Sequence, residues 1–403
     1  MSTPPHAPSQ PPSRRVQARW LDESPAESMS PAPAHSTTPA WVVLVSVIGV
    51  ATYVGFLFYG VAYHSGYVLG ALPVVPVLVL ITALFAKRLA RLDDDPSVYP
   101  LLMGALAVKL LGALIRYWIA YTVYKGQVDA TDYDKVGRFL ASSFRHGNFA
   151  VHLSGRFSGT NFMRVATGAV YTVMPASRMA GFLVFAWLGF IGLVLYWRAF
   201  RMAVPIGDAR RYALLLFLLP SLVYWPSAIG KEAWMTLVLG VCALGVARIF
   251  TNHLVTGVLL LGVGLLGSAY VRPHLGLAVF AGLLVAVLLR RRKSRNPVVP
   301  IVAIGLLLYV GLALVSQNQQ YFGVENLTQE SIQNQLDHTA QQTNEGGSAF
   351  TPVRVNTPAD FPLAFVTIFY RPTPLEAHNA QGMLTAAEGM TLVALTVLSI
   401  RRV

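Results

Sequence analysis

The sequence is short of charge, and most of the charge it has is positive. Of its 403 residues only 12% are Asp, Glu, Lys or Arg, against about a quarter in soluble domains. There are 31 Lys and Arg but only 18 Asp and Glu. The single cysteine, Cys242, excludes an internal disulfide framework and a thiolate metal site. No glycine-rich nucleotide-binding loop occurs between the apolar stretches, which argues against an enzyme that uses ATP or a nucleotide sugar.

Hydrophobic residues, in contrast, make up 54% of the chain and recur in long stretches. About 20 apolar residues cross a hydrocarbon core of about 30 Å as one helix, and a helix satisfies its own backbone in lipid. The composition therefore predicts an all-α fold, a polytopic transmembrane helical bundle in the cell membrane. About ten spans are expected, at residues 41–63, 67–86, 99–124, 166–197, 212–229, 233–250, 254–271, 275–290, 298–315 and 383–400.

Basic residues lie in short clusters between these stretches, which is typical of cytoplasmic loops and does not indicate nucleic-acid binding. With the N-terminus inside and ten spans, every cluster faces the cytoplasm and both termini are cytoplasmic. Residues 1–39, rich in Pro, Ser and Ala, are expected to form a disordered cytoplasmic tail before a transmembrane domain at 40–403. The clusters lie at 87–91, 198–211, 290–295 and 401–402.

Prolines predict that two of the expected spans are broken. Pro175 divides the fourth, so that a short outer segment precedes a span beginning near Ala176. Pro220 and Pro226, in the stretch LPSLVYWPSAIGKEAW, break the fifth near the outer surface. Broken backbone at membrane depth is tolerated where it lines a protein or water-filled cavity.

The outer side then receives two long loops, 125–165 and 316–382. The first carries Asp129, Asp132 and Asp134 and continues as an amphipathic helix, which we expect to lie flat on the membrane. The aspartates are open to two interpretations, as caps of this helix or as functional carboxylates at the water–lipid boundary. The apolar side of the helix is formed by Val136, Phe139, Leu140 and Phe144.

A further group of polar residues falls at the outer ends of helices. Together they predict a positively charged pocket for a phosphate head group, since Arg and Lys both bind phosphate. The alternative is a set of anchors and surface ion pairs at the membrane boundary. The short apolar run FPLAFVTIFY is expected to return the second loop to the surface. The group comprises Arg116, Lys231, Glu232, Arg272, His274, Arg371, Glu376 and His378.

One charge lies deeper in an expected span. Lys109 shares a helix face with Arg116, seven residues later. It either pairs with a buried acid, for which Glu388 is a candidate, or points into a cavity.

Three motifs carry a resemblance to a known family. The loop D-A-x-D-Y-D with its amphipathic helix, the segment P-S-x-x-x-W-x-S-x-x-x-K-E (220–232) and the run R-P-x-P-x-E-A-H-N (371–379) are similar to bacterial multi-pass proteins of cell-envelope polysaccharide clusters. Their plan resembles the GT-C superfamily of glycosyltransferases, whose donors are polyprenyl-phosphate-linked sugars. In that superfamily an outer-loop acid, here following the third expected span, is a catalytic base or a metal ligand.

The resemblance implies transfer of a sugar to a glycan or lipid acceptor on the outer face. Asp132 or Asp134 would be the base, with Asp129 as a further candidate. Lys231, Arg272 and Arg371 would clamp the phosphate, helped by His274 and His378. No definite cofactor is indicated, although the D-Y-D pair would suit a divalent cation.

Two other functions remain open at this point. An O-antigen-polymerase-like protein, which joins lipid-linked oligosaccharides, would use similar outer cations without an aspartate base. A transporter or flippase for lipid-linked sugars should show repeat symmetry and binding groups near the midplane. No repeat of 20–50 residues is apparent in the sequence.

Overall fold

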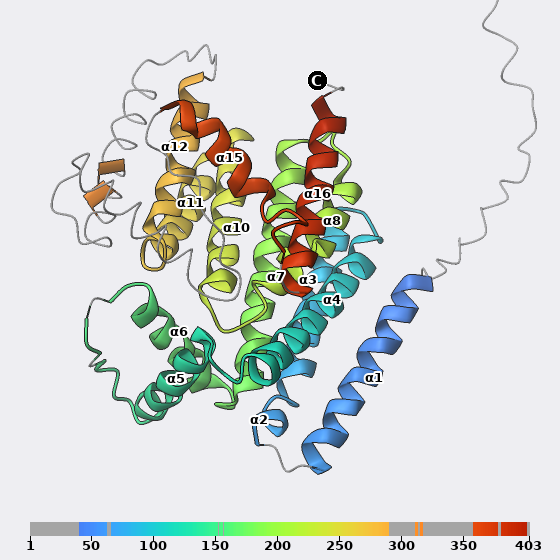
Figure 1. Cartoon of the computed structure of the whole chain (residues 1–403), viewed down its shortest axis with the longest axis vertical. Helices are drawn as coiled ribbons and strands as arrows, with labels where there is room; N and C mark the ends of the chain where they lie inside the picture. Colours follow the sequence, from blue (N-terminus) through green and yellow to red (C-terminus); the bar gives the residue numbers. More distant parts are fainter. Residues whose placement is uncertain are drawn as a thin grey trace, which may run out of the picture. The chain divides into compact units, whose positions relative to one another are not determined.

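The computed structural model describes residues 40–62, 66–151, 153–155, 157–289, 311–312, 315–316, 358–377 and 380–400. The chain divides after Ala40 into two units, and the described helices belong to the second, Trp41–Val403, apart from Ala40 at the start of the first helix. Every regular element among the described residues is a helix, which confirms the all-α class (Figure 1). The tail 1–39 and residues 317–357 of the expected loop 316–382 lie outside the described residues.

Four helices in the described part are long and apolar enough to cross a membrane. They are α4 (Val98–Trp118) with the π-helix η1 (Ile119–Val123), α7 (Arg178–Ala203), α10 (Lys231–Phe250) and α16 (Ala380–Ile400). Shorter apolar stretches occur in α1 (Ala40–Ala62), α11 (Leu254–Ala269) and α12 (Pro273–Leu289). These helices support a membrane protein, whereas the count of ten spans stays a prediction.

The remaining helices are shorter or less apolar. These helices are α2 (Gly66–Leu69), α3 (Val74–Leu92), α5 (Asp129–Arg145), α6 (Thr160–Val173), α8 (Ala209–Leu218), α9 (Pro220–Tyr224), the 3₁₀-helix η2 (Pro358–Asp360) and α15 (Phe361–Tyr370).

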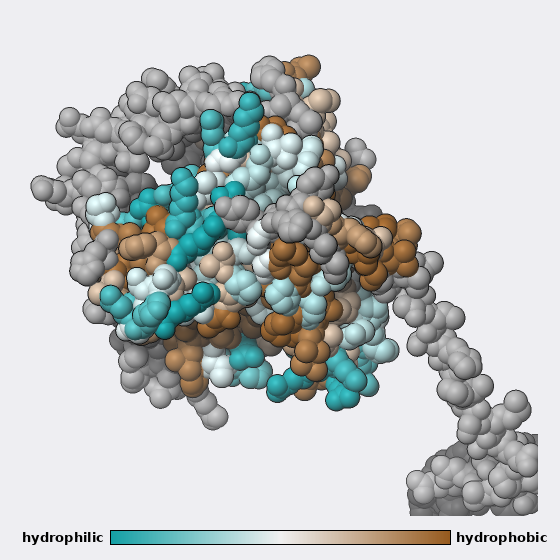
Figure 2. Space-filling view, turned by 90° about the horizontal axis from the view of Figure 1, so that it is seen from below, coloured by the Kyte–Doolittle hydropathy of each residue, from teal (hydrophilic) through white to brown (hydrophobic). Residues whose placement is uncertain are grey.

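Figure 2 shows the molecule from below the view of Figure 1. On this face, hydrophilic patches lie beside hydrophobic ones.

Both predicted helix breaks are confirmed. The fourth expected span is two helices, because α6 ends at Val173 and α7 begins at Arg178. Ser177 caps α7 by accepting a hydrogen bond from the amide of Ala180 at 3.4 Å. In the fifth span, α8 ends at Leu218 and the five-residue α9 follows. Proline causes both breaks, since it has no N–H to continue the helical bonding.

Helix α7 forms the centre of the packing. It is hydrophobic all round, and a helix of that kind is stable only when it is surrounded. It packs against α3, α4 and α10. A Cβ atom on Gly192 would overlap the carbonyl oxygen of Thr236, so glycine allows the close approach of α7 and α10.

An ion-pair cluster joins the ends of α3 and α7. Arg198 binds both carboxylate oxygens of Asp93, and Arg201 lies 3.0 Å from the same group. Two of the basic residues expected on the cytoplasmic side therefore meet the α3–α4 turn at one end of the bundle. The loop with Asp129 follows α4 and lies at the opposite end of that span.

The orientation is testable with two exposed positions that flank the span Val98–Val123. An impermeant thiol reagent added to intact cells should label Gln127→Cys and should not label Ser97→Cys. Both should react after lysis, which controls for reactivity. Labelling of Ser97→Cys in intact cells would invert the orientation and remove the case for an outer-face site.

Candidate functional site

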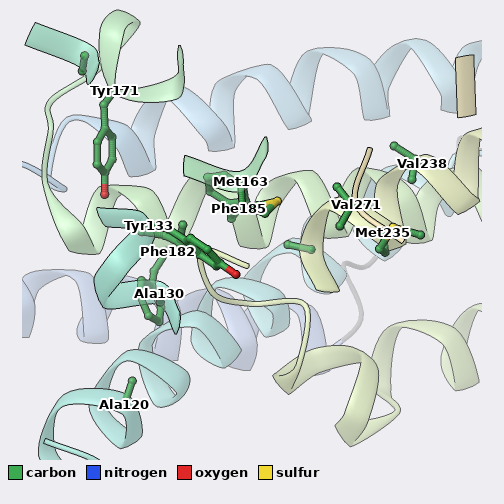
Figure 3. Close-up of a cluster of buried hydrophobic side chains, with 13 residues drawn as sticks. Ala120, Ala130, Tyr133, Met163, Tyr171, Phe182, Phe185, Met235, Val238 and Val271 are labelled. Carbon is green, nitrogen blue, oxygen red and sulfur yellow. The ribbon is translucent and has the colours of Figure 1, made fainter. Parts of the chain in front are cut away.

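A cavity of about 230 Å³ with charged groups in its wall lies where α4, α5 and α10 meet. Four of the expected site residues line it: Arg116, Asp129, Lys231 and Glu232. Arg116 and Asp129 come from neighbouring helices, whereas Lys231 and Glu232 follow about a hundred residues later. The aromatic side chains of Tyr133, Phe182 and Trp225 complete the wall. Figure 3 shows Tyr133 and Phe182 close together, in the buried cluster that also holds Ala130 and Ala120.

Asp129 is the first residue of α5. The preceding Val128 is extended, with φ −140° and ψ 149°, so the helix begins abruptly at the cavity. A carboxylate in the first turn is favoured by the helix dipole. Its Oδ2 accepts a weak hydrogen bond, 3.4 Å long, from the hydroxyl of Tyr133. Burial and the charge of Asp129 raise the pKa of Tyr133, so the phenol stays protonated and remains a donor to this carboxylate.

Lys231 and Glu232 begin α10 at another side of the cavity. Gly230 precedes them in an extended conformation. The ammonium group of Lys231 has no hydrogen bond or ion pair within the described part of the chain. Glu232 does not pair with Lys231; its Oε1 accepts a hydrogen bond of 2.9 Å from Arg272. A lysine at a helix N-terminus, where the amides also point outward, provides positive potential for an anion.

Arg116 lies in the last turn of α4 and links the cavity to the broken helix. Its Nη1 donates to the hydroxyl of Tyr224 at 2.7 Å. The guanidinium carbon lies 4.5 Å from the ring centre of Tyr224 and 4.7 Å from that of Trp225. Such cation–π contacts orient the cation without neutralising it. Arg116 therefore keeps its charge at the cavity wall.

The other two aspartates do not line the cavity. Asp134 is fully buried and accepts hydrogen bonds from Arg138, Arg178 and Tyr171, the last at 2.8 Å. Asp132 forms two hydrogen bonds, 2.8 and 3.0 Å long, with Arg164 on α6. These partners give Asp132 and Asp134 structural ion pairs, whereas Asp129 alone of the three faces the cavity.

The remaining expected residues are spread over other places. Arg272 reaches the site only through Glu232, and His274 follows it at the start of α12. Arg371 binds Glu376 at 3.0 Å, and the arginine holds the pKa of that carboxyl at about 2. This pair lies in a turn after α15 and does not line the cavity. His378 lies outside the described residues.

Helix α5 is placed differently from the expectation. Leu140 and Phe144, expected to face lipid, are buried, and α5 packs against α6. Of the expected apolar side, Phe139 is 72% exposed. The reason is that a second helix covers the apolar face, which periodicity alone cannot reveal. The periodicity did predict a helix here, and it did not reveal Tyr133 as a wall residue.

Among the residues that the structure describes, no group of three or more His, Cys, Asp or Glu side chains is arranged to hold an ion. Asp129 and Glu232 both line the cavity, so two carboxylates are available to a divalent cation there.

In comparisons with protein-family models, curated proteins and solved structures, no significant match to the chain is found.

Proposed function

We propose that the chain is an integral-membrane glycosyltransferase, which transfers a sugar from a polyprenyl-phosphate-linked donor to a cell-envelope glycan or lipid acceptor. The observation that carries this proposal is the cavity that Asp129 shares with Lys231 and Arg116. A proton acceptor and two cations in one cavity are what the reaction needs. The GT-C-like motifs of the sequence agree with this chemistry.

The cavity residues have distinct roles in this reaction. A hydroxyl oxygen of the acceptor attacks the anomeric carbon of the sugar, and Asp129 takes the hydroxyl proton. The bond between the anomeric carbon and the phosphate oxygen breaks, and the phosphate leaves with the electron pair. Lys231 and Arg116 stabilise the negative charge that grows on this phosphate. Asp129 thus takes the role of base that the sequence assigned first to Asp132 or Asp134.

Glu232 and Arg272 have a supporting role in this proposal. Arg272 orients Glu232 through their hydrogen bond, which leaves Lys231 free for the phosphate. A carboxylate beside the leaving group would also accept hydrogen bonds from sugar hydroxyls. A divalent cation held by Asp129 and Glu232 is compatible with the same scheme.

An apolar groove supports a donor with a long hydrocarbon chain. It has a volume of about 360 Å³ and lies between α1, α3, α4 and α7. On α4 its wall includes Leu110 and Leu114, which precede Arg116 by less than two turns. Helical periodicity turns Leu110 and Leu114 away from Arg116, so a lipid whose phosphate sits at Arg116 would pass round α4 for its chain to reach this groove.

The phosphate role of Lys231 is testable by binding. We expect Lys231→Ala to bind a short-chain polyprenyl phosphate roughly 10- to 100-fold more weakly, since a hydrogen bond to a charged group contributes about 1.5–3 kcal/mol. Lys231→Arg should retain part of the affinity, because lysine acts mainly as a point charge. The measurement is titration of the purified protein in lipid nanodiscs.

The matched control is Lys135→Ala, an exposed lysine of α5 that does not line the cavity. Its affinity should equal that of the wild type. Equal affinity in Lys231→Ala as well would reduce Lys231 to a helix-end residue and remove the phosphate clamp from the proposal.

A further inference from the structure

The short helix α9 leaves two backbone groups without a hydrogen-bond partner inside the helix. Trp225 has helical angles, φ −63° and ψ −49°, so the nitrogen of residue 226 takes the position of the donor to the carbonyl of Leu222. That residue is Pro226, which has no N–H. At the other end, the amide of Ser221 lies in the first turn, where a helix offers no internal acceptor.

Two buried charges supply the missing partners. Lys109 of α4 is 2% exposed, and its ammonium group donates to the carbonyl of Leu222 at 2.6 Å. Glu388 of α16 is 9% exposed and accepts from the amide of Ser221 at 2.7 Å and from its hydroxyl at 2.5 Å. The two charges thus bind consecutive residues of α9. The pairing of Lys109 with Glu388 considered from the sequence is therefore not direct.

The same face of α4 follows the broken segment toward the cavity. A Cβ atom on Gly112 would lie 2.6 Å from the carbonyl oxygen of Val223, so the backbones are in close contact. Arg116, one turn further along α4, contacts Tyr224 and Trp225. Lys109, Gly112 and Arg116 therefore fix successive residues of one segment. That segment continues directly into Trp225 and Lys231 of the cavity wall.

We propose that Lys109 and Glu388 are positioning residues of the cavity. Lys109 replaces the hydrogen bond that Pro226 removes, and Glu388 caps the start of α9. Together they hold the segment that carries Trp225 and Lys231 opposite Asp129. That the cavity binds a lipid phosphate rests on the proposed function. That Lys109 and Glu388 hold the cavity wall in place does not depend on it.

The test for Lys109 uses a reporter in the cavity wall and a rescue. Ala228→Cys, in a Cys242→Ala background, places the reporter thiol in the half-buried wall. Lys109→Met should raise its rate of modification by a small thiol reagent on the order of tenfold, because the Leu222 carbonyl loses its donor. Adding Pro226→Ala should return the rate to within about threefold, because a backbone N–H again reaches that carbonyl.

The affinity for a short-chain polyprenyl phosphate should fall in Lys109→Met and recover when Pro226→Ala is added. The control Lys135→Met should change neither the thiol modification rate nor this affinity. An unchanged rate in Lys109→Met, or no rescue by Pro226→Ala, would overturn the positioning role. If Lys109→Met does not fold, recovery of a folded protein by Pro226→Ala supports the role, and failure of both variants contradicts it. A wild type that binds no phosphate would end the proposed function, while the thiol rates would still decide this inference.

Glu388 is tested by its conservative variant. Glu388→Gln keeps one acceptor oxygen for the amide of Ser221, whereas Glu388→Met keeps none. The reporter thiol should therefore react faster in Glu388→Met than in Glu388→Gln. Equal rates in the two variants would show that Glu388 does not act through Ser221.

Discussion

Replacing Asp129 with asparagine should lower sugar transfer by about 10²–10⁴-fold, the usual contribution of acid–base catalysis. The change keeps the size of the side chain and the helix start, so the protein should fold normally. Binding of a polyprenyl phosphate should also be nearly unchanged, because Lys231 and Arg116 remain. The measurement is product formation from a lipid-phosphate-linked sugar by membranes or nanodiscs that contain equal amounts of each protein.

Asp132→Asn is the matched control for this experiment, since it lies one turn further along the same helix and pairs with Arg164. We expect it to retain most of the activity. A larger loss in Asp132→Asn than in Asp129→Asn would return the role of base to Asp132. Full activity of Asp129→Asn, with product still formed, would instead favour a polymerase-like reaction that needs no aspartate base.

Loss of Asp134 should have the largest effect on stability. Its buried carboxylate is bound by Arg138, Arg178 and Tyr171, and so it joins α5, α6 and α7. Breaking a buried ion pair by removing one partner costs about 3–5 kcal/mol. We therefore expect Asp134→Ala to unfold at a clearly lower temperature or denaturant concentration in a fixed detergent.

The control for stability is again Asp132→Asn, because the side chain of Asp132 is 44% exposed. Exposed ion pairs contribute about 0–1 kcal/mol, so the unfolding temperature of Asp132→Asn should be close to that of the wild type. The stability of Asp134→Asn should lie between the stabilities of Asp134→Ala and Asp132→Asn, since an amide still accepts one hydrogen bond from an arginine. If Asp134→Ala were no less stable than Asp132→Asn, the cluster would not be what fixes α5 to α7.

Local features of the chain were predictable because they depend on neighbouring residues. The length of an apolar stretch determines whether a helix can cross lipid, and proline breaks a helix wherever it lacks the N–H. Pro175 and Pro220 therefore marked the helix breaks correctly. The shared face of Lys109 and Arg116 follows in the same way from helical periodicity.

The functional site depends on contacts between distant segments, which periodicity does not contain. Asp129, Asp132 and Asp134 lie within six residues, yet a helix turns them in different directions. The pair of Asp134 with Arg138 is local, four residues along the helix, and could be inferred from that spacing. The hydrogen bonds of Asp134 with Tyr171 and Arg178 span 37 and 44 residues, and local spacing could not predict them.

The sequence alone thus determined the all-α class, the apolar helices, the helix breaks and the set of charged residues near them. Only the tertiary structure decided which of these charges meet. It placed Asp129 with Lys231 and Arg116, kept Asp134 in a buried ion-pair cluster, and joined Lys109 to a carbonyl 113 residues away. The physical reason is that α4, α6, α7, α9 and α10 supply the partners, and their packing is a property of the whole helical bundle.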